Sequence, residues 1–195
     1  MLEKFKNKKI IITGHTGFKG SWLTLWLHLL GAKITGISLS KHTNPSHYEL
    51  LKIKNNIKDI RMDITNYEKL NKIIKKTKPD YFFHLAAQAL VKKSFSNPLE
   101  TIKTNIIGTA NILESLKNLE NDCAALIITS DKCYKNKELI RGYKENDEFG
   151  GDDPYSGSKA SAEIIFHSYF DSFFQKSRVK IASARAGNVI GGGDW

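Results

Sequence analysis

The chain has 195 residues and a mass of 22.0 kDa, and 41% of its residues are hydrophobic and 26% charged. This length and composition predict one globular domain with a substantial core. No apolar run is long enough to cross a bilayer, and the amino terminus has no signal-peptide core. The sequence therefore does not predict a membrane protein or an exported one.

Thirty basic residues against twenty acidic ones leave a formal net charge of +10. Such a balance favours anionic partners, among which nucleic acid has to be weighed. The lysines are scattered and lack interleaved aromatic residues, so solvated helix faces are the better interpretation. We therefore expect no nucleic-acid partner, whereas a negatively charged small substrate is compatible with this charge.

The cysteines and the histidines of the first long loop give no indication of a metal site. Cys123 and Cys133 are expected to be free thiols in a reducing cytosol, which predicts a cytoplasmic protein. His42 and His47 have no cysteine or carboxylate at ligand spacing, so no bound metal is expected.

Apolar, β-branched runs alternate along the chain with stretches of helical periodicity. Strands are expected over 8–13, 33–39, 60–64, 79–88, 124–130 and 179–184. Helices are expected over 21–30, 66–76, 98–119 and 153–175. This alternation predicts a doubly wound Rossmann fold of the α/β class, with a mostly parallel sheet covered on both faces and one domain over 1–195. Trp22 and Trp26 recur at helical spacing in the first helix, where core packing is the expected role.

Three glycines at three-residue spacing, Gly14, Gly17 and Gly20, separate the first predicted strand from the first predicted helix. There Gly14 can make a tight turn, Gly17 lets the backbone approach a pyrophosphate, and Gly20 lets helix and strand pack closely. With Thr16 and Phe18, they form a candidate phosphate-binding turn for a dinucleotide cofactor. An ordinary strand-to-helix turn is the alternative.

The acidic residue that usually follows the second strand of such a site, about twenty residues after the turn, is absent. Ser38, Ser40, Lys41 and His42 stand there instead. Serine can hydrogen-bond a ribose, and Lys41 can tolerate a 2′-phosphate. These residues alone therefore leave the choice between NAD and NADP open.

Asp63 ends the third predicted strand and is a candidate for contact with the adenine edge of the cofactor. Ile64 would then pack on the adenine ring. A helix N-cap or a surface acid is the alternative interpretation of Asp63.

Tyr155 and Lys159 stand at i and i+4 of the predicted helix over 153–175, which puts both side chains on one face. An ammonium group beside a phenol favours phenolate. We therefore expect Lys159 to lower the pKa of Tyr155 toward neutrality, so that Tyr155 acts as a base. The spacing alone is common, but after a glycine turn of this kind the combination indicates an oxidoreductase site.

Five sequence blocks carry a resemblance to a known family. They are GHTGFKGSW over 14–22, TNPS over 43–46, HLAAQ over 84–88, SDKCY over 130–134 and RAGNVIGGGDW over 185–195. With the Tyr155/Lys159 pair, they resemble the extended short-chain dehydrogenase/reductase family and, within it, the CDP-glucose 4,6-dehydratases. The resemblance runs nearly end to end. It implies NAD as the cofactor, with Ala86, Ala87 and Gln88 among the residues that bind it.

The resemblance also implies an internal redox cycle on a nucleotide sugar, CDP-glucose, in lipopolysaccharide O-antigen biosynthesis. Tyr155 would take the 4-hydroxyl proton while C4 gives hydride to NAD⁺; the C6 hydroxyl would leave as water, and hydride would return to C6. Ser130 would hydrogen-bond the 4-oxygen, Asp131 would protonate the leaving hydroxyl, and Lys132 would take the C5 proton.

Related dehydratases commonly carry glutamate at the position of Lys132. Lysine is a base only where burial or nearby positive charge depresses its pKa. A surface ion pair is therefore the alternative for Asp131 and Lys132. Asn105 resembles the family's helix asparagine that holds a water or backbone near the active lysine. His84 is expected to cap its strand end without a catalytic role.

The resemblance further implies a homodimer through the helices over 98–119 and 153–175, although core burial within one chain explains the same pattern. The last block normally leads into a smaller C-terminal substrate domain, which we expect this chain to lack, so its own turnover is an open question. A nucleotide-sugar epimerase or reductase would share Tyr155 and Lys159 but would not need Asp131 and Lys132. A catalytically silent NAD-binding module is the third hypothesis.

Overall fold

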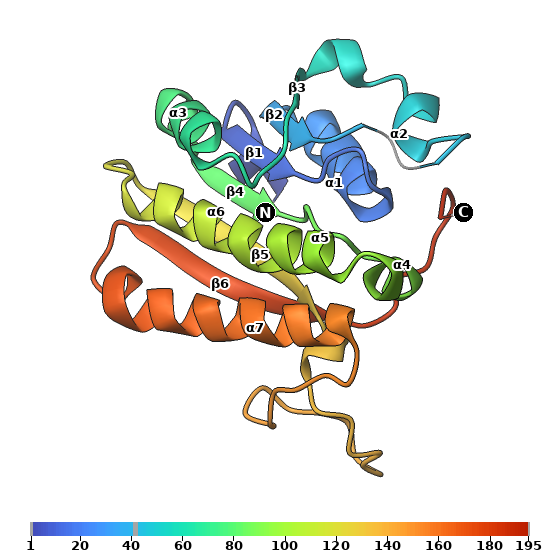
Figure 1. Ribbon diagram of the computed structural model, residues 1–195. Helices are drawn as coiled ribbons and strands as arrows, with labels where there is room; N and C mark the ends of the chain where they lie inside the picture. Colours follow the sequence, from blue (N-terminus) through green and yellow to red (C-terminus); the bar gives the residue numbers. More distant parts are fainter. Residues whose placement is uncertain (1, 41–42, 195) are drawn as a thin grey trace.

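The computed structural model describes residues 2–40 and 43–194, and within them six parallel strands form one sheet with the order β3-β2-β1-β4-β5-β6 (Figure 1). The strands are β1 (Lys9–Thr13), β2 (Lys33–Ser38), β3 (Lys58–Arg61), β4 (Tyr81–His84), β5 (Cys123–Ser130) and β6 (Val179–Ala186). The strand order reverses between β1 and β4, and open α/β sheets bind ligands outside the carboxyl ends of the strands at such a point. The doubly wound fold predicted from the sequence is confirmed.

The helices follow the predicted alternation with two additions. They are α1 (Phe18–Leu29), α2 (His47–Leu50), α3 (Tyr67–Thr77), α4 (Val91–Ser96), α5 (Pro98–Ile102), α6 (Gly108–Lys117) and α7 (Pro154–Tyr169). The π-helical turns Lys103–Ile107 and Phe170–Phe174 join α5 to α6 and extend α7. Short 3₁₀ turns lie at Leu2–Phe5, Lys54–Asn56 and Asp131–Cys133. The helix predicted over 98–119 is thus one rod with a π turn inside it, whereas α2 and α4 were not predicted.

Helices cover the two faces of the sheet unequally. In Figure 1, α6 and α7 lie side by side across one face, and α3 packs next to α6. The larger core lies under these three helices and includes Leu70, Phe82, Ile112, Leu116 and Phe166. On the other face, Leu27 of α1 packs against side chains of β1 and β2. Each fully buried side chain of this kind contributes about 1.5–3 kcal/mol relative to exposure, so the larger core dominates the packing energy.

The prediction that the tryptophans of the first helix pack in the core is wrong. Trp22 and Trp26 are 44% and 58% exposed, while Thr24 of the same helix is fully buried. The cause is the close approach of the start of α1 to the turn that follows β1, because a Cβ on Gly20 would overlap the carbonyl oxygen of Gly14. Only small side chains fit between α1 and the strands at that end, so the tryptophans lie on the outer face.

No helix in the described ranges is long and apolar enough to span a membrane. Across the same residues, no three His, Cys, Asp or Glu side chains are grouped so that they could hold a metal ion. Cys123 and Cys133 are free and buried, and burial raises the pKa of the Cys133 thiol to about 11. His42 lies outside the described residues.

Candidate active site

The turn between β1 and α1 requires glycine at two of its three glycine positions. Gly14 has a φ of +77°, and a Cβ there would lie 2.6 Å from the backbone nitrogen of Ala86. A Cβ on Gly20 would overlap the carbonyl oxygen of Gly14. Because neither position tolerates a side chain, the turn lies tightly against the loop after β4, and the first turn of α1 lies tightly against Gly14 and His15.

Gly17 is different, because packing does not demand a glycine there. As the N-cap of α1 it has an ordinary extended backbone (φ −74°, ψ 168°), and a Cβ would only touch the Gly14 carbonyl oxygen at 3.4 Å. Gly17 offers no capping side chain to the first N–H groups of α1, which begins at Phe18. A helix start without a side-chain cap can hold a phosphate group, and a glycine at this position lets that phosphate approach the backbone.

The candidate residues for the adenosine end of a cofactor lie at the carboxyl end of β2. Ser38 is buried, and its Oγ accepts the backbone N–H of Thr16 at 3.3 Å. Ser40 is exposed beyond the end of the strand. Lys41 and His42 lie outside the described residues. Of these side chains, Ser40 is thus the one in the described part that is open to a ribose.

The two candidates after β3 differ in their exposure. Asp63 is exposed and its Oδ1 accepts the backbone N–H of Thr65 at 2.8 Å, whereas Asn66 caps α3. Ile64 is 4% exposed and belongs to the larger core, where it faces Gly108 of α6. In this structure the Ile64 side chain thus packs against α6, and its packing on an adenine ring stays a prediction.

A buried polar cluster next to β2 and β3 was missed by the sequence analysis. His15 is fully buried and its Nε2 lies 3.0 Å from Asp59 Oδ1, while Asp59 Oδ2 accepts from Tyr48 at 3.1 Å and from Arg61 at 2.7 Å. Burial lowers the pKa of His15. Burial acts to raise the pKa of Asp59, but the Arg61 hydrogen bond and the charges of His15 and Arg61 lower that pKa overall. An acidic residue, Asp59, therefore does lie beside β2, but it belongs to β3 and its carboxylate is turned inward. No local sequence spacing predicts its position.

The loop after β4 is pinned by Asn105, which lies in the π-helical turn. Asn105 Oδ1 accepts the Gln88 backbone N–H at 2.8 Å, and its Nδ2 donates to the Gln88 carbonyl at 3.0 Å and to Ser158 Oγ at 2.8 Å. The Gln88 side chain in turn donates to Thr101 Oγ1 at 2.8 Å. Asn105 thus ties the loop that carries the candidate cofactor residues to the position just before Lys159.

The end of β4 itself is closed by His84. Its Nδ1 lies 2.7 Å from Thr13 Oγ1 and its Nε2 lies 3.2 Å from Thr109 Oγ1, so both ring nitrogens are engaged. Burial lowers the pKa of His84 to about 3, which keeps the ring neutral. Beyond it, the Ala86 N–H donates to Thr13 Oγ1 at 3.3 Å, and Ala87 is half-buried. These contacts fit a strand-end role for His84.

Tyr155 and Lys159 lie on the first turns of α7, where Asp153 sets the start of the helix. Asp153 Oδ1 accepts the backbone N–H groups of Tyr155 and Ser156 at 2.9 and 3.0 Å, and Pro154 fits the first helical position. The Lys159 Nζ lies 5.9 Å from the centre of the Tyr155 ring. Tyr155 and Lys159 are only 8% and 7% exposed, so the predicted pair is assembled in a nearly dry setting.

The direction predicted for the pKa of Tyr155 is wrong in this structure. Burial raises the pKa of Tyr155, and the hydrogen bond with Ser130 does not offset it. Burial also lowers the pKa of Lys159 to about 8, helped by the positive charge of Lys19 at the start of α1. For the pKa of Tyr155, the effect of burial therefore outweighs the lowering that the spacing of Tyr155 and Lys159 led us to expect.

The turn after β5 carries the other three predicted residues. Ser130 Oγ donates to Asp131 Oδ1 at 3.0 Å and accepts the Lys132 backbone N–H at 3.2 Å. Lys132 Nζ lies 3.3 Å from Asp131 Oδ2, and the two side chains are 51% and 41% exposed. The ion pair weighed as the alternative is present, and the described residues do not supply the burial that a basic Lys132 requires. Ser130, in contrast, is buried and links this turn to Tyr155.

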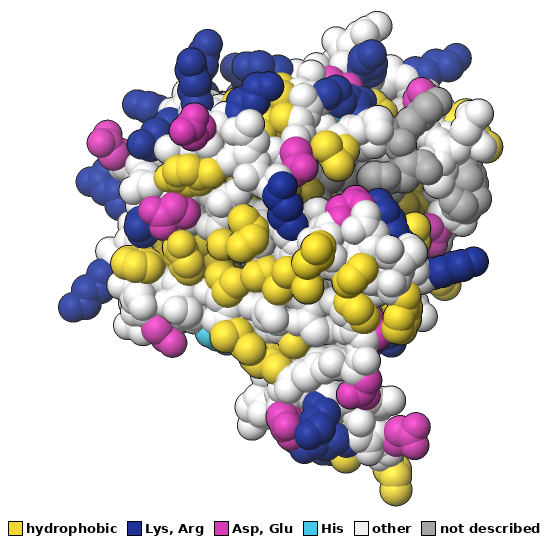
Figure 2. Space-filling view, in the orientation of Figure 1, with side chains coloured by type: hydrophobic (Ala, Val, Ile, Leu, Met, Phe, Trp, Pro, Cys, Tyr) yellow, Lys and Arg dark blue, Asp and Glu magenta, His cyan; other side chains and the backbone are white. Residues whose placement is uncertain are grey.

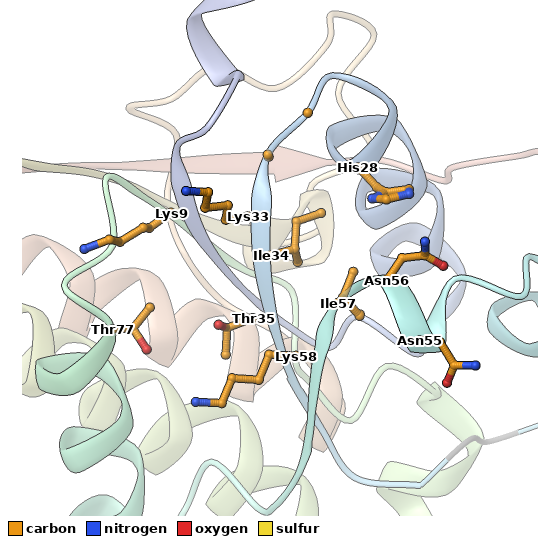
Figure 3. Close-up of a pocket in the computed structure, with 12 residues that line it drawn as sticks. Lys9, His28, Lys33, Ile34, Thr35, Asn55, Asn56, Ile57, Lys58 and Thr77 are labelled. Carbon is orange, nitrogen blue, oxygen red and sulfur yellow. The ribbon is translucent and has the colours of Figure 1, made fainter.

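A hollow of about 590 Å³ lies elsewhere, at the amino ends of β1, β2 and β3. Figure 3 shows Lys9, Lys33 and Lys58 on its rim, with their ammonium groups on one side. The glycine turn and the Tyr155/Lys159 pair lie at the opposite, carboxyl end of the strands. This hollow is therefore separate from the candidate active site.

The switch point of the sheet, the glycine turn and the buried tyrosine–lysine pair together define a Rossmann domain of the short-chain dehydrogenase/reductase class. Residues 11–189 match the family described as GDP-mannose 4,6 dehydratase. The chain belongs to that family and, with it, to the extended short-chain dehydrogenases/reductases.

Among curated proteins, the chain is 46% identical over 202 residues to the CDP-glucose 4,6-dehydratase of Salmonella typhimurium, covering 100% of this chain and 56% of that protein. It is 30% identical over 197 residues to the dTDP-D-glucose 4,6-dehydratase of Dictyostelium discoideum, covering 94% of this chain and 44% of that protein. The chain thus spans about half the length of the curated relatives it matches.

Solved structures agree on the fold. The epimerase Mth375 from Methanothermobacter thermautotrophicus superposes with a TM-score of 0.79 at 25% identity, covering 94% of this chain and 52% of that one. Pal from Bacillus thuringiensis superposes with a TM-score of 0.76 at 26% identity, covering 91% and 55%. The similarity therefore extends across nearly the whole of this chain and about half of each structure.

Proposed function

We propose that this chain is the cofactor-binding part of an NAD-dependent lyase, a nucleotide-sugar 4,6-dehydratase that converts CDP-glucose into CDP-4-keto-6-deoxyglucose. The observation that carries the proposal is the contact between two groups at one edge of the sheet. Ser130 joins the buried Tyr155 to the turn that holds Asp131 and Lys132, so a base for oxidation adjoins an acid and a base for elimination. Similarity to the Salmonella CDP-glucose 4,6-dehydratase supports this choice of substrate.

The residues present fit NAD. The start of α1 has no side-chain cap and has room at Gly17 for a phosphate, and the exposed Ser40 can hydrogen-bond the adenosine ribose. Asp63 is exposed, so that it can meet the adenine edge, and Ala86 borders the turn at Gly14. Ala87, half-buried next to Ala86, is proposed to bind the cofactor with it. When bound, NAD would supply the hydride acceptor and donor for the sugar.

The oxidation depends on Tyr155 and Ser130. We propose that Tyr155 accepts the proton of the sugar 4-hydroxyl and that Ser130 hydrogen-bonds the same oxygen. Tyr155 must be a phenolate before it can accept this proton. Lys159 lies close enough to stabilise that phenolate, and Lys159 is charged at neutral pH because its pKa is about 8. Burial of Tyr155 keeps water away from the reacting oxygen.

The elimination depends on the exposed turn. Asp131 would give a proton to the leaving 6-hydroxyl, and Lys132 would take the C5 proton, which the 4-keto group makes acidic. Both side chains are about half-exposed in this chain, so a sugar placed over the turn would itself remove the surrounding water. That desolvation favours the neutral lysine and the protonated acid that the step needs.

We further propose that two copies associate through an apolar surface on α4, the α5–α6 rod and α7. Figure 2 shows hydrophobic side chains running across this face. The exposed apolar residues on these elements are Val91, Phe95, Leu99, Ile102, Ile107, Ile164, Phe170 and Phe173. Ile164→Glu should shift the mass in analytical ultracentrifugation from two chains to one, because a charge would be buried at the contact. An unchanged mass would contradict this surface.

We further propose a cytoplasmic location, for which the free thiols of Cys123 and Cys133 are the support. The resemblance leads us to propose a role in O-antigen biosynthesis.

The test of the proposed reaction is incubation of the chain with CDP-glucose and NAD⁺, followed by mass spectrometry and NMR of the sugar. The expected product has lost one water and carries a 4-keto group. An epimer of unchanged mass would instead support the epimerase alternative. No product, despite NAD⁺ binding seen by calorimetry, would support the silent cofactor-binding module. The same assay on a fusion with the part of the Salmonella relative that lies outside the matched region tests whether that part affects turnover.

A further inference from the structure

A buried ion pair lies behind the candidate active site, and the reaction scheme does not use it. Glu163 is fully buried on α7, one helical turn beyond Lys159. Its carboxylate accepts from Thr129 Oγ1 at the end of β5, from Ser183 Oγ of β6 at 3.2 Å, and from Arg185 Nη2 of β6 at 3.0 Å. A carboxylate this deep in the fold requires such a set of donors.

Arg185 extends this network to the far side of the turn after β5. Its Nη1 donates to the Tyr134 hydroxyl at 2.7 Å and to the Glu145 carbonyl at 2.8 Å. Its guanidinium lies 5.0 Å from the centre of the Tyr134 ring and 4.8 Å from that of Phe149. The planar group thus contacts two aromatic rings while it hydrogen-bonds Glu163, which a lysine ammonium cannot reproduce.

Glu163 and Arg185 therefore bind the chain on both sides of the turn Asp131–Cys133. Glu163 holds Thr129, which immediately precedes Ser130, and Arg185 holds Tyr134, which follows the turn. The same Arg185 contacts fix the arm, defined here as residues 135–149, which projects away from the body of the molecule below α7 (Figure 1). Both ends are tied to the helix that carries Tyr155.

We infer that Glu163 and Arg185 are positioning residues that hold Asp131 and Lys132 at a set distance from Tyr155. This role rests on the proposed dehydratase function, because the distance between the turn and Tyr155 matters only if both act on one sugar. Neither residue touches the reacting atoms in this account. Their role is to keep the turn from moving, since a misplacement of about 1 Å can cost about 10²-fold in rate.

The test compares Arg185→Lys with Arg178→Lys, a matched control just before β6 whose guanidinium makes one long hydrogen bond, 3.4 Å, to the Glu120 carbonyl. Hydrogen–deuterium exchange of the amides in 130–149 should rise in Arg185→Lys and stay unchanged in Arg178→Lys. In the assay that shows turnover, kcat should fall about 10–100-fold while the KM for the sugar nucleotide changes within about twofold. NAD⁺ affinity should not change.

Tyr134→Phe is the milder variant, because it removes only the hydroxyl acceptor and keeps the stacked ring. It should raise exchange in the same segment by less than Arg185→Lys does. Unchanged exchange over 130–149 in Arg185→Lys would overturn the inference, whatever the turnover. Equal losses of kcat and NAD⁺ affinity would also overturn it, because they would indicate general damage. If exchange over 130–149 rises in Arg185→Lys but the wild-type chain makes no dehydrated product, the proposed function is contradicted. The role of Arg185 in holding the turn in place is then still supported.

Discussion

Two pairs of side chains at the same edge of the sheet differ sharply in their surroundings. Tyr155 and Lys159 are 8% and 7% exposed, whereas the side chains of Asp131 and Lys132 are 41% and 51% exposed. The first pair stands on a long helix packed against the core, and the second on a short turn whose ends are held by more distant residues.

This difference separates the two halves of the proposed chemistry. The packing of this chain already supplies the dry setting that a hydride step needs around Tyr155 and Lys159. For Asp131 and Lys132 that setting has to come from whatever covers the turn, the sugar included. Variants of the first pair should therefore act through the chain's own stability and redox step, and variants of the second through the elimination alone.

The largest effect is expected for Tyr155→Phe. Removing the phenolate oxygen that accepts the 4-hydroxyl proton should lower the rate of C4 oxidation by about 10²–10⁴-fold. The phenyl ring keeps the packing, so NAD⁺ affinity should change within about twofold. Stopped-flow absorbance of reduced cofactor and calorimetry measure the two quantities. A variant that oxidises CDP-glucose at the normal rate would remove Tyr155 from the reaction.

Lys159→Met should stabilise the folded chain while slowing oxidation, by less than Tyr155→Phe does. The pKa of Lys159 is about 8 when folded, below its ordinary 10.5. Below about pH 8, Lys159 is protonated in both the folded and the unfolded chain, and the folded chain carries the whole cost of burying the ammonium. Between about pH 8 and 10.5 the folded chain binds fewer protons than the unfolded chain, so the free energy of unfolding rises with pH. The span from 10.5 to about 8 corresponds to roughly 3 kcal/mol.

Urea unfolding at pH 7 and pH 10.5 measures this effect. Lys159→Met should gain up to roughly 3 kcal/mol over the wild type at pH 7 and little at pH 10.5. Lys176→Met, at an exposed position just after the π-helical turn that extends α7, is the control and should show no such difference. A gain that is the same at both pH values would mean that burial of the ammonium is not its cause.

Substitutions of the glycines in the turn after β1 distinguish effects on stability from effects on NAD⁺ binding. Gly20→Ala forces a Cβ into the Gly14 carbonyl, so it should cost about 1–3 kcal/mol of stability and weaken NAD⁺ binding. Gly17→Ala meets only an ordinary contact and should weaken NAD⁺ binding with little loss of stability. Gly142→Ala, which has no neighbour within 4 Å, should change neither. Equal effects of the first two variants on stability would contradict this distinction.

The smallest effect is expected for Lys132→Glu, on the exposed side of the comparison. NAD⁺ affinity should stay within about twofold, because the side chain does not contribute to the glycine turn or the buried pair. The elimination step should change its pH dependence, with activity retained to lower pH, since a carboxylate is a base where an ammonium is not. Loss of cofactor binding in this variant would show that Lys132 has another role.

The sequence predicted the features that depend on local pattern. Strand–helix alternation gave the sheet, and the spacing of Gly14 and Gly20 indicated the two positions where a Cβ does not fit. Spacing also placed Tyr155 and Lys159 on one helix face, but it could not give the direction of the Tyr155 pKa. That direction depends on burial, which is a property of the finished fold.

Features formed by distant residues were beyond local pattern. Asp59 contacts His15 from 44 positions away in the sequence, and Glu163 contacts Arg185 from 22 positions away. No helical or strand periodicity predicts contacts over such separations. The outward position of Trp22 was missed for a related reason. Apolar spacing gives a helix a face, but the close contact at Gly20 decides which face meets the sheet.

The central claim is that the redox pair and the exposed turn act on one sugar in one cycle. Its most direct test is turnover of CDP-glucose labelled with deuterium at C4, with NMR and mass spectrometry of the product. The account predicts a 4-keto-6-deoxy sugar with the deuterium at C6 and no accumulation of reduced cofactor. Deuterium retained at C4 of an epimer, or trapped in reduced cofactor without loss of water, would contradict it.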